Sequence, residues 1–120
     1  MTDQRGLGVR GEELAARHLA GAGLTVVERN VRLGPGEIDL VAREDGDLVF
    51  VEVKTRIGDA ETAPDTAVTP TKLERLERLA EAYLDRAGTP DVPWRVDVVA
   101  IVLGRDGRTI QIDHLRGAYL

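Results

Sequence analysis

An Asp-Gly pair at residues 45 and 46 constrains the fold of this chain more than any other feature of its sequence. It lies between residues 37–44 and 47–56, and both of these segments have the apolar alternation of strands. An Asp-Gly pair in this setting is the strongest short-range signal of a β-hairpin with a two-residue turn. Such a turn determines which residues of the two strands oppose each other.

Four charged residues meet in the register that this turn sets. Asp39 faces Glu52 and Glu37 faces Lys54, with all four side chains on one face of the hairpin. Directly opposed carboxylates repel each other, because their Cβ atoms lie only about 4.5–5.5 Å apart. A divalent cation between Asp39 and Glu52 would remove this repulsion, and Lys54 would partly compensate it. These residues predict an acidic, lysine-containing site of the kind that metal-dependent nucleases use.

An ordinary surface hairpin is the alternative to a metal site. In that interpretation Glu37 and Lys54 form a cross-strand ion pair, and the other two carboxylates lie on a solvated face. Large apolar residues are expected on the same face, at Val41, Leu48 and Phe50. They indicate partial burial, where unpaired carboxylates are costly, and so favour the metal site.

The rest of the chain predicts two helices and three more strands. The first helix covers residues 9–20. The second begins at Pro70 with Thr69 as its N-cap and ends at Gly88. The further strands are expected at residues 24–33, 94–103 and 109–115. The order αβββαββ predicts one domain over residues 1–120, of the α/β (α+β) class, with a mixed sheet flanked by helices.

Composition limits the partners and compartments that suit this domain. Because no cysteine is present, any metal must be held by oxygen or histidine ligands. The net charge of -5 opposes general nucleic-acid binding, since Lys and Arg supply most of the non-specific affinity for phosphates. The longest apolar run, residues 98–103, is far too short to span a membrane, and residues 1–5 lack the apolar segment of a signal peptide. We therefore expect a cytoplasmic protein that does not bind membranes.

Charged residues on the two helices are weaker candidates. Glu12 is a candidate metal ligand, although acidic residues early in a helix also simply favour the helix dipole. Lys72 and Arg75 lie in the first turns of the second helix, where phosphate binding is favoured, and Arg56 follows the third strand. Lys54 and Lys72 are the two lysines beside 14 arginines, a pattern that is explained equally by a requirement for a compact ammonium group and by chance.

Several segments resemble the YraN-like family of small bacterial proteins. They are GE at residues 11–12, NVR at 30–32, GEIDLV at 36–41 and FVEVKTR at 50–56. AV at residues 67–68 with Lys72, and RVDVVAI at 95–101, resemble further family segments. The likeness covers nearly the whole chain.

This family resembles a branch of the PD-(D/E)XK nuclease superfamily and is most similar in size and order to Holliday-junction resolvases. The resemblance implies a restriction-endonuclease-like fold and magnesium-dependent cleavage of phosphodiester bonds in DNA, with branched DNA as a candidate substrate. Asp39 matches the aspartate of the superfamily's first motif, and Glu52 and Lys54 match its E-x-K. Glu12 matches the helix glutamate of resolvases. Ile38 replaces the proline of the name motif and leaves the ligands intact, but the sequence has no basic arm to raise DNA affinity.

These assignments predict a magnesium site with Mn²⁺ as an alternative ion. Asp39, Glu52 and the Val53 carbonyl are the expected ligands, and Glu12 is a further one. Lys54 is expected to orient the attacking water. The expected contacts to nucleic acid are Arg32, Arg56, Lys72 and Arg75.

Two other functions are compatible with this sequence. One is a nucleic-acid-binding module that keeps the nuclease fold without cleavage, and the other is a protein-interaction module, which the acidic charge favours. Clustered carboxylates favour the enzyme, because binding alone does not require them. Resolvase-like action would require a homodimer, since two strands must be cut symmetrically, and exposed sheet edges allow such pairing.

Overall fold

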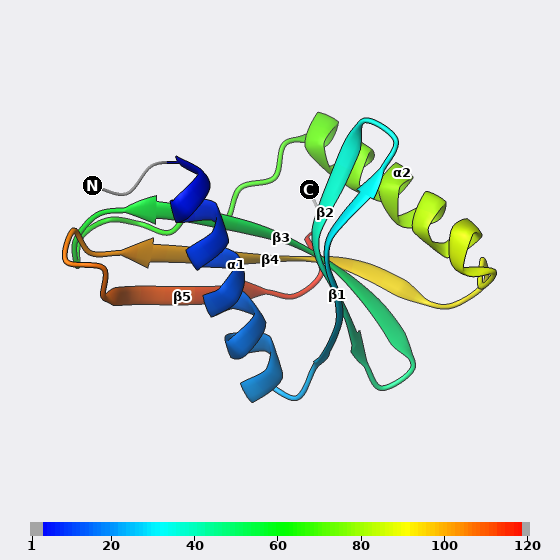
Figure 1. Ribbon diagram of the computed structural model, residues 1–120, viewed down its shortest axis with the longest axis horizontal. Coiled ribbons are helices and arrows are strands. Elements are labelled where there is room, and N and C mark those ends of the chain that lie inside the picture. The colour runs from blue at the N-terminus through cyan, green and yellow to red at the C-terminus, as the bar shows by residue number, and fades with distance from the viewer. Residues whose placement is uncertain (1–3, 119–120) are drawn as a thin grey trace.

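Two helices and five strands follow one another in the predicted order αβββαββ (Figure 1). The computed structural model describes residues 4–118. The helices are α1 (Gln4–Gly21) and α2 (Pro70–Ala87), and the strands are β1 (Thr25–Leu33), β2 (Gly36–Glu44), β3 (Asp47–Ile57), β4 (Trp94–Leu103) and β5 (Thr109–Leu115). Each predicted strand boundary is confirmed to within one residue, whereas α1 begins before residue 9. The signal-peptide prediction falls partly on residues 1–3, which lie outside the described residues.

The strands form one mixed sheet in the order β1-β2-β3-β4-β5. Neighbours are antiparallel except β3 and β4, which pair in parallel. Parallel neighbours need a crossover connection, and α2 lies in that connection. A mixed sheet with two helices packed on it is the predicted α+β architecture, and it agrees with a nuclease-like α/β fold.

Local chemistry sets the ends of the elements that carry the candidate site. The β2–β3 hairpin turns at Asp45, whose φ of 58° is a left-handed conformation that Asp tolerates better than most residues. At the start of α2, the hydroxyl of Thr69 accepts a hydrogen bond from the Lys72 N–H. The helix ends at Gly88, which has a left-handed φ of 73°.

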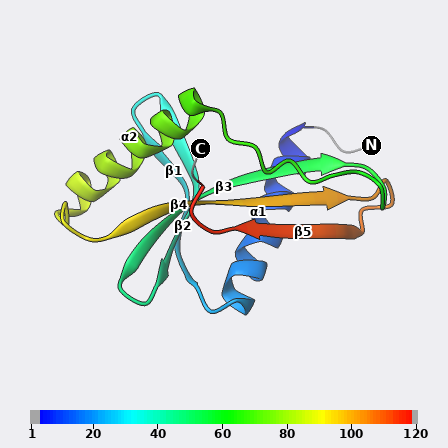
Figure 2. The same cartoon turned by 180° about the vertical axis from the view of Figure 1, so that it is seen from behind.

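Each face of the sheet is covered by one helix. In Figure 1, α1 lies in front of β4 and β5, and α2 lies behind the β1–β2 hairpin; Figure 2 shows both orders reversed. The buried residues on the α1 side include Ala15, Leu19, Leu40, Val51 and Ile101. Those on the α2 side include Ile38, Val41, Phe50, Leu79 and Tyr83. Burying each such side chain contributes about 1.5–3 kcal/mol, so both helices are held mainly by packing. Neither described helix is apolar enough over its length to cross a membrane.

Candidate metal centre

Strands β2 and β3 separate where the candidate ligands lie. Their ladder has the predicted register but ends at the pair Leu40–Val51. Beyond it, residues 36–38 of β2 are paired with β1. Ile38 packs on the α2 side of the sheet, whereas Leu40 packs on the α1 side. The regular alternation of faces therefore breaks at Asp39, between these two residues.

The predicted cross-strand pairs are wrong at this separation. Within the described ladder no pair joins Asp39 to Glu52. Glu37 opposes Arg32 of β1 in the register, rather than Lys54. The physical reason is that β2 turns with β1 towards α2, where burial of Ile38 stabilises the new direction.

Asp39 fills the gap that opens between the strands. Its Oδ2 accepts a hydrogen bond of 2.8 Å from the backbone N–H of Val53, a group that the β2–β3 ladder no longer reaches. The N–H and C=O of one strand residue lie on the same edge of its strand. The Val53 carbonyl therefore faces the same gap, as its predicted role as a ligand requires.

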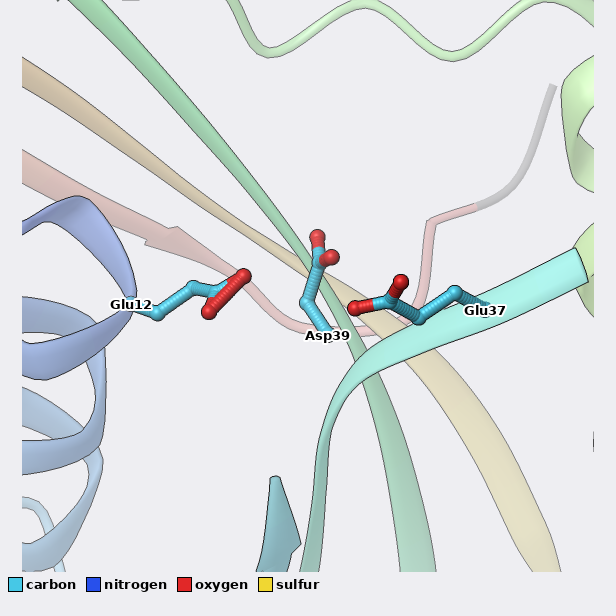
Figure 3. Close-up of side chains that lie close together, drawn as sticks. All are labelled: Glu12, Glu37 and Asp39. Atoms are coloured by element: carbon cyan, nitrogen blue, oxygen red, sulfur yellow. The ribbon is translucent and has the colours of Figure 1, made fainter. Parts of the chain in front are cut away.

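Three carboxylates converge at this gap (Figure 3). Glu12 of α1, Glu37 and Asp39 of β2 each present one oxygen, and the three oxygens lie within 4.8 Å of one another. Glu12 and Asp39 were expected as metal ligands, whereas Glu37 was expected at the site opposite Lys54 and not as a ligand. A three-carboxylate cluster of this size is compatible with a small hard cation.

Gly11 allows α1 to approach the sheet closely enough to bring Glu12 to the cluster. A Cβ added at Gly11 would lie only 1.9 Å from the Thr55 hydroxyl oxygen on β3. A larger residue at this point would require the Thr55 side chain or the first turns of α1 to shift. Because Glu12 is the next residue, its position depends on this contact.

The electrostatics of the cluster disfavour three ionised carboxylates. Burial, together with the neighbouring carboxylates and against the opposing effect of the Val53 N–H, raises the pKa of Asp39 to about 7. Burial likewise raises the pKa of Glu12, while a hydrogen bond with Asn30 opposes the rise. A bound cation would favour the ionised forms of both side chains.

Glu52 lies beside the cluster and forms an ion pair. Its Oε1 is 2.6 Å from the Nζ of Lys72 on α2, and only 11% of the Glu52 side chain is exposed. The charge of Glu52 contributes to the raised pKa of Asp39. Glu52 therefore interacts electrostatically with Asp39, while its own carboxylate is paired with Lys72.

Lys54 and Arg56 point to the connection between β3 and α2. The Lys54 ammonium lies 3.4 Å from an oxygen of Asp65 and donates a hydrogen bond to the Ala67 carbonyl. The Arg56 guanidinium lies 3.6 Å from the other oxygen of Asp65. Both cations are thus held by residues 58–69, and no contact within the described residues joins Lys54 to the three carboxylates.

A groove of about 790 Å³ opens from the carboxylates along α2. Glu37, Asp39 and Glu52 line one end, and its cationic residues are Lys72, Arg75 and Arg78. Its apolar surface comes from Leu33, Pro35, Leu76, Leu79 and Ala82. The exposed Arg32 of β1 is not among the lining residues. Of the four predicted nucleic-acid contacts, Lys72 and Arg75 therefore lie together in this groove.

Sequence reasoning missed a buried charged network in the first half of β4. Asp97 is fully buried, and it accepts hydrogen bonds from Arg95 (2.9 Å) and the Gly117 N–H (2.9 Å) and contacts His114 Nε2 (2.7 Å). An aspartate within the apolar run of β4 was the available signal. This network ties the segment after β5 to the sheet and takes no part in the carboxylate cluster.

Comparison with known proteins identifies the family. The model of the uncharacterised protein family UPF0102 matches residues 11–101. This chain belongs to the UPF0102 family. A UPF0102 protein of Streptomyces coelicolor, SCO5602, is 49% identical over 98% of this chain and 91% of its own length. Another, STH1475 of Symbiobacterium thermophilum, is 50% identical over 87% of this chain and 88% of its own length.

Membership of UPF0102 confirms the YraN-like resemblance that the sequence motifs indicated. The matched region contains all the carboxylates of the candidate centre and the groove residues of α2. These UPF0102 names state no reaction. The function must therefore be inferred from the site.

Proposed function

We propose that this UPF0102 protein is a metal-dependent endonuclease that hydrolyses phosphodiester bonds of DNA. The observation that carries the proposal is the convergence of Glu12, Glu37 and Asp39 at the gap between β2 and β3. Three carboxylates so close together, one with a pKa raised to about 7, form an arrangement that a cation stabilises. The adjoining groove, with Lys72 and Arg75, leads from this point and suits a phosphate backbone.

The donor set fits Mg²⁺, and Mn²⁺ as its substitute. All the available donors are hard oxygens, which both ions accept. Asp39, Glu12 and Glu37 would hold the ion, with the Val53 carbonyl at the same gap. Glu52 would join them after leaving Lys72. Such an ion supplies a Lewis acid and lowers the pKa of a bound water.

The protein's own groups would bind and orient the substrate. Lys72 and Arg75 would hold phosphates in the groove next to the scissile bond. Lys54 would orient the attacking water, which requires its ammonium to leave Asp65 and the Ala67 carbonyl. An orienting role suits Lys54 better than that of a base, because nearby carboxylates favour its charged form.

The net charge of -5 predicts weak binding of DNA by the isolated chain. A homodimer would double the phosphate contacts and would allow symmetric cutting of branched DNA. Branched substrates and dimerisation therefore belong to the same proposal, as features that would compensate for the acidic surface.

A binding module without cleavage is the second candidate function. It is favoured by the contacts of Lys54, whose ammonium is directed to residues 58–69 rather than to the carboxylates. In this case DNA would bind in the groove and Mg²⁺ would bind at the cluster, but no product would form.

Calorimetric titration with Mg²⁺, run in parallel with cleavage of labelled four-way junction, flap and single-stranded DNA, tests the proposal. Asp39→Asn keeps a side-chain oxygen that can accept the Val53 hydrogen bond and removes one ligand charge, and exposed Asp91→Asn is the matched control. We expect Mg²⁺ binding and metal-dependent cleavage by the native protein and the control, with both lost in Asp39→Asn. Binding without cleavage of any substrate would support the module, and absence of Mg²⁺ binding even with DNA present would refute both functions.

A further inference from the structure

Lys72 joins the carboxylate end of the groove to its cationic side. Its Nζ lies 2.6 Å from Glu52 Oε1, and 39% of its side chain is exposed. Its backbone is fixed in the first turn of α2, where its N–H donates to the Thr69 hydroxyl. The long side chain therefore has a fixed base and an ammonium group that solvent and ligands can reach.

The other cations near the site have different partners. Lys54 is held by Asp65 and the Ala67 carbonyl, and Arg78 is paired with Glu74 at 2.6 Å. Arg75 lines the groove, and no ion pair joins it to a carboxylate within the described residues. Lys72 is thus the described cation that contacts a carboxylate of the candidate site.

An ammonium group and a divalent cation compete for Glu52. The Lys72 ammonium can be exchanged because 39% of its side chain is exposed, whereas the largely buried Glu52 carboxylate needs another cation in its place. A lysine also has a flexible stem and rotatable donors, which let it move from a carboxylate to a phosphate in the same groove. Arg75, about one helical turn away, is placed to receive the same polyanion.

We propose that Lys72 is an exchangeable cation, which neutralises Glu52 in the metal-free protein and transfers to a phosphate of the substrate when Glu52 turns to the metal. This inference rests on the proposed function and names Lys72 as a positioning residue for it. Metal binding at Glu52 then releases the group that binds the substrate. By linkage, a phosphate that captures Lys72 strengthens metal binding to the same extent.

Titration with MgCl₂ alone, without nucleic acid, shows whether removal of the Lys72 ammonium raises or lowers the affinity for Mg²⁺. Removing the competing ammonium in Lys72→Gln tightens Mg²⁺ binding by at least about two- to fivefold, the size of an exposed ion pair, because burial of Glu52 strengthens its interaction with Lys72. Lys72→Arg retains the charge and shows no such gain. Arg75→Gln is the matched control for loss of one positive charge from the groove, and it changes Mg²⁺ affinity less than Lys72→Gln does. Melting temperatures confirm that each variant is folded.

Binding of a labelled single-stranded oligonucleotide, measured with and without Mg²⁺, tests the transfer. Lys72→Gln weakens this binding mainly when Mg²⁺ is present, whereas Arg75→Gln weakens it under both conditions. Unchanged or weaker Mg²⁺ binding by Lys72→Gln, with native binding intact, overturns the exchange and leaves the proposed function standing. If neither the native protein nor Lys72→Gln binds Mg²⁺, the proposed function and the exchange both fail.

Discussion

Replacing Asp39 by Asn tests whether this carboxylate destabilises the metal-free protein. Burial raises its pKa from 3.8 to about 7, so between these values the folded protein keeps a proton that the unfolded chain has released. The stability of the native protein relative to Asp39→Asn therefore falls as the pH rises from about 4 to about 7, and is constant above that range. At about 1.36 kcal/mol per pH unit, this displacement corresponds to at most about 4 kcal/mol.

Thermal unfolding of both proteins at about pH 4.5 and about pH 8 measures this effect. Relative to the native protein, we expect Asp39→Asn to gain about 1–3 kcal/mol of stability between about pH 4.5 and about pH 8, because part of the full displacement already lies below about pH 4.5. Each kcal/mol corresponds to a difference of roughly 4 °C in Tm for a domain of this size. Asp91→Asn, at an exposed position, is the control for the change from Asp to Asn itself. Adding Mg²⁺ at the higher pH is expected to raise the native Tm and to remove the advantage of Asp39→Asn. An equal difference between the native protein and Asp39→Asn at both pH values would refute the reasoning.

Three further tests concern the packing of α1 at Gly11, the carboxylate that holds Lys54, and the buried network around Asp97. Gly11→Ala is expected to lower stability by about 1–3 kcal/mol and to weaken Mg²⁺ binding, because its Cβ would overlap the Thr55 hydroxyl. Adding Thr55→Ala to Gly11→Ala is expected to restore part of the stability and part of the Mg²⁺ affinity, measured by melting and calorimetry, because the nearest remaining Thr55 atom is 3.0 Å away. A double variant that is no more stable and binds Mg²⁺ no more tightly than Gly11→Ala would argue against close packing as the cause. Asp65→Asn removes the carboxylate charge that pairs with Lys54 and Arg56, although Lys54 still donates to the Ala67 carbonyl. This change is expected to strengthen DNA binding about two- to fivefold in an anisotropy titration, with Mg²⁺ affinity unchanged. Asp97→Asn removes the charge that compensates Arg95, and it is expected to lower the free energy of unfolding in urea by about 3–5 kcal/mol. The folded fraction is expected to keep its Mg²⁺ affinity, and loss of that affinity would show that the network supports the metal site.

The elements and the hairpin register were predictable because their signals are local. The Asp45-Gly46 turn sets the pairing down to Leu40–Val51, and that pairing is confirmed. Thr69, Pro70 and Gly88 likewise mark both ends of α2, as the structure shows. Each of these signals depends on a few neighbouring residues, so no knowledge of the tertiary structure is needed.

The arrangement of the site was only partly predictable, because it depends on contacts between distant segments. The separation of β2 from β3 follows from burial of Ile38 against α2, and hairpin geometry alone does not contain that contact. Glu37 reaches Glu12 because α1 packs at Gly11, which no strand pattern indicates. The position of Lys54 is set by residues 58–69, a segment without periodic structure.

The parallel pairing of β3 with β4 has a consequence for folding. The two hairpins that flank it close locally, whereas β3 meets β4 only after residues 58–93 have been brought into place. Closing a long connection is slow, and parallel pairing is slow for the same reason. Until then β3 has an open edge at Val49, Phe50 and Val51, a run that another copy of the chain can pair with. This open strand also carries Glu52 and Val53, so substitutions there are expected to affect the yield of folded protein as well as the site.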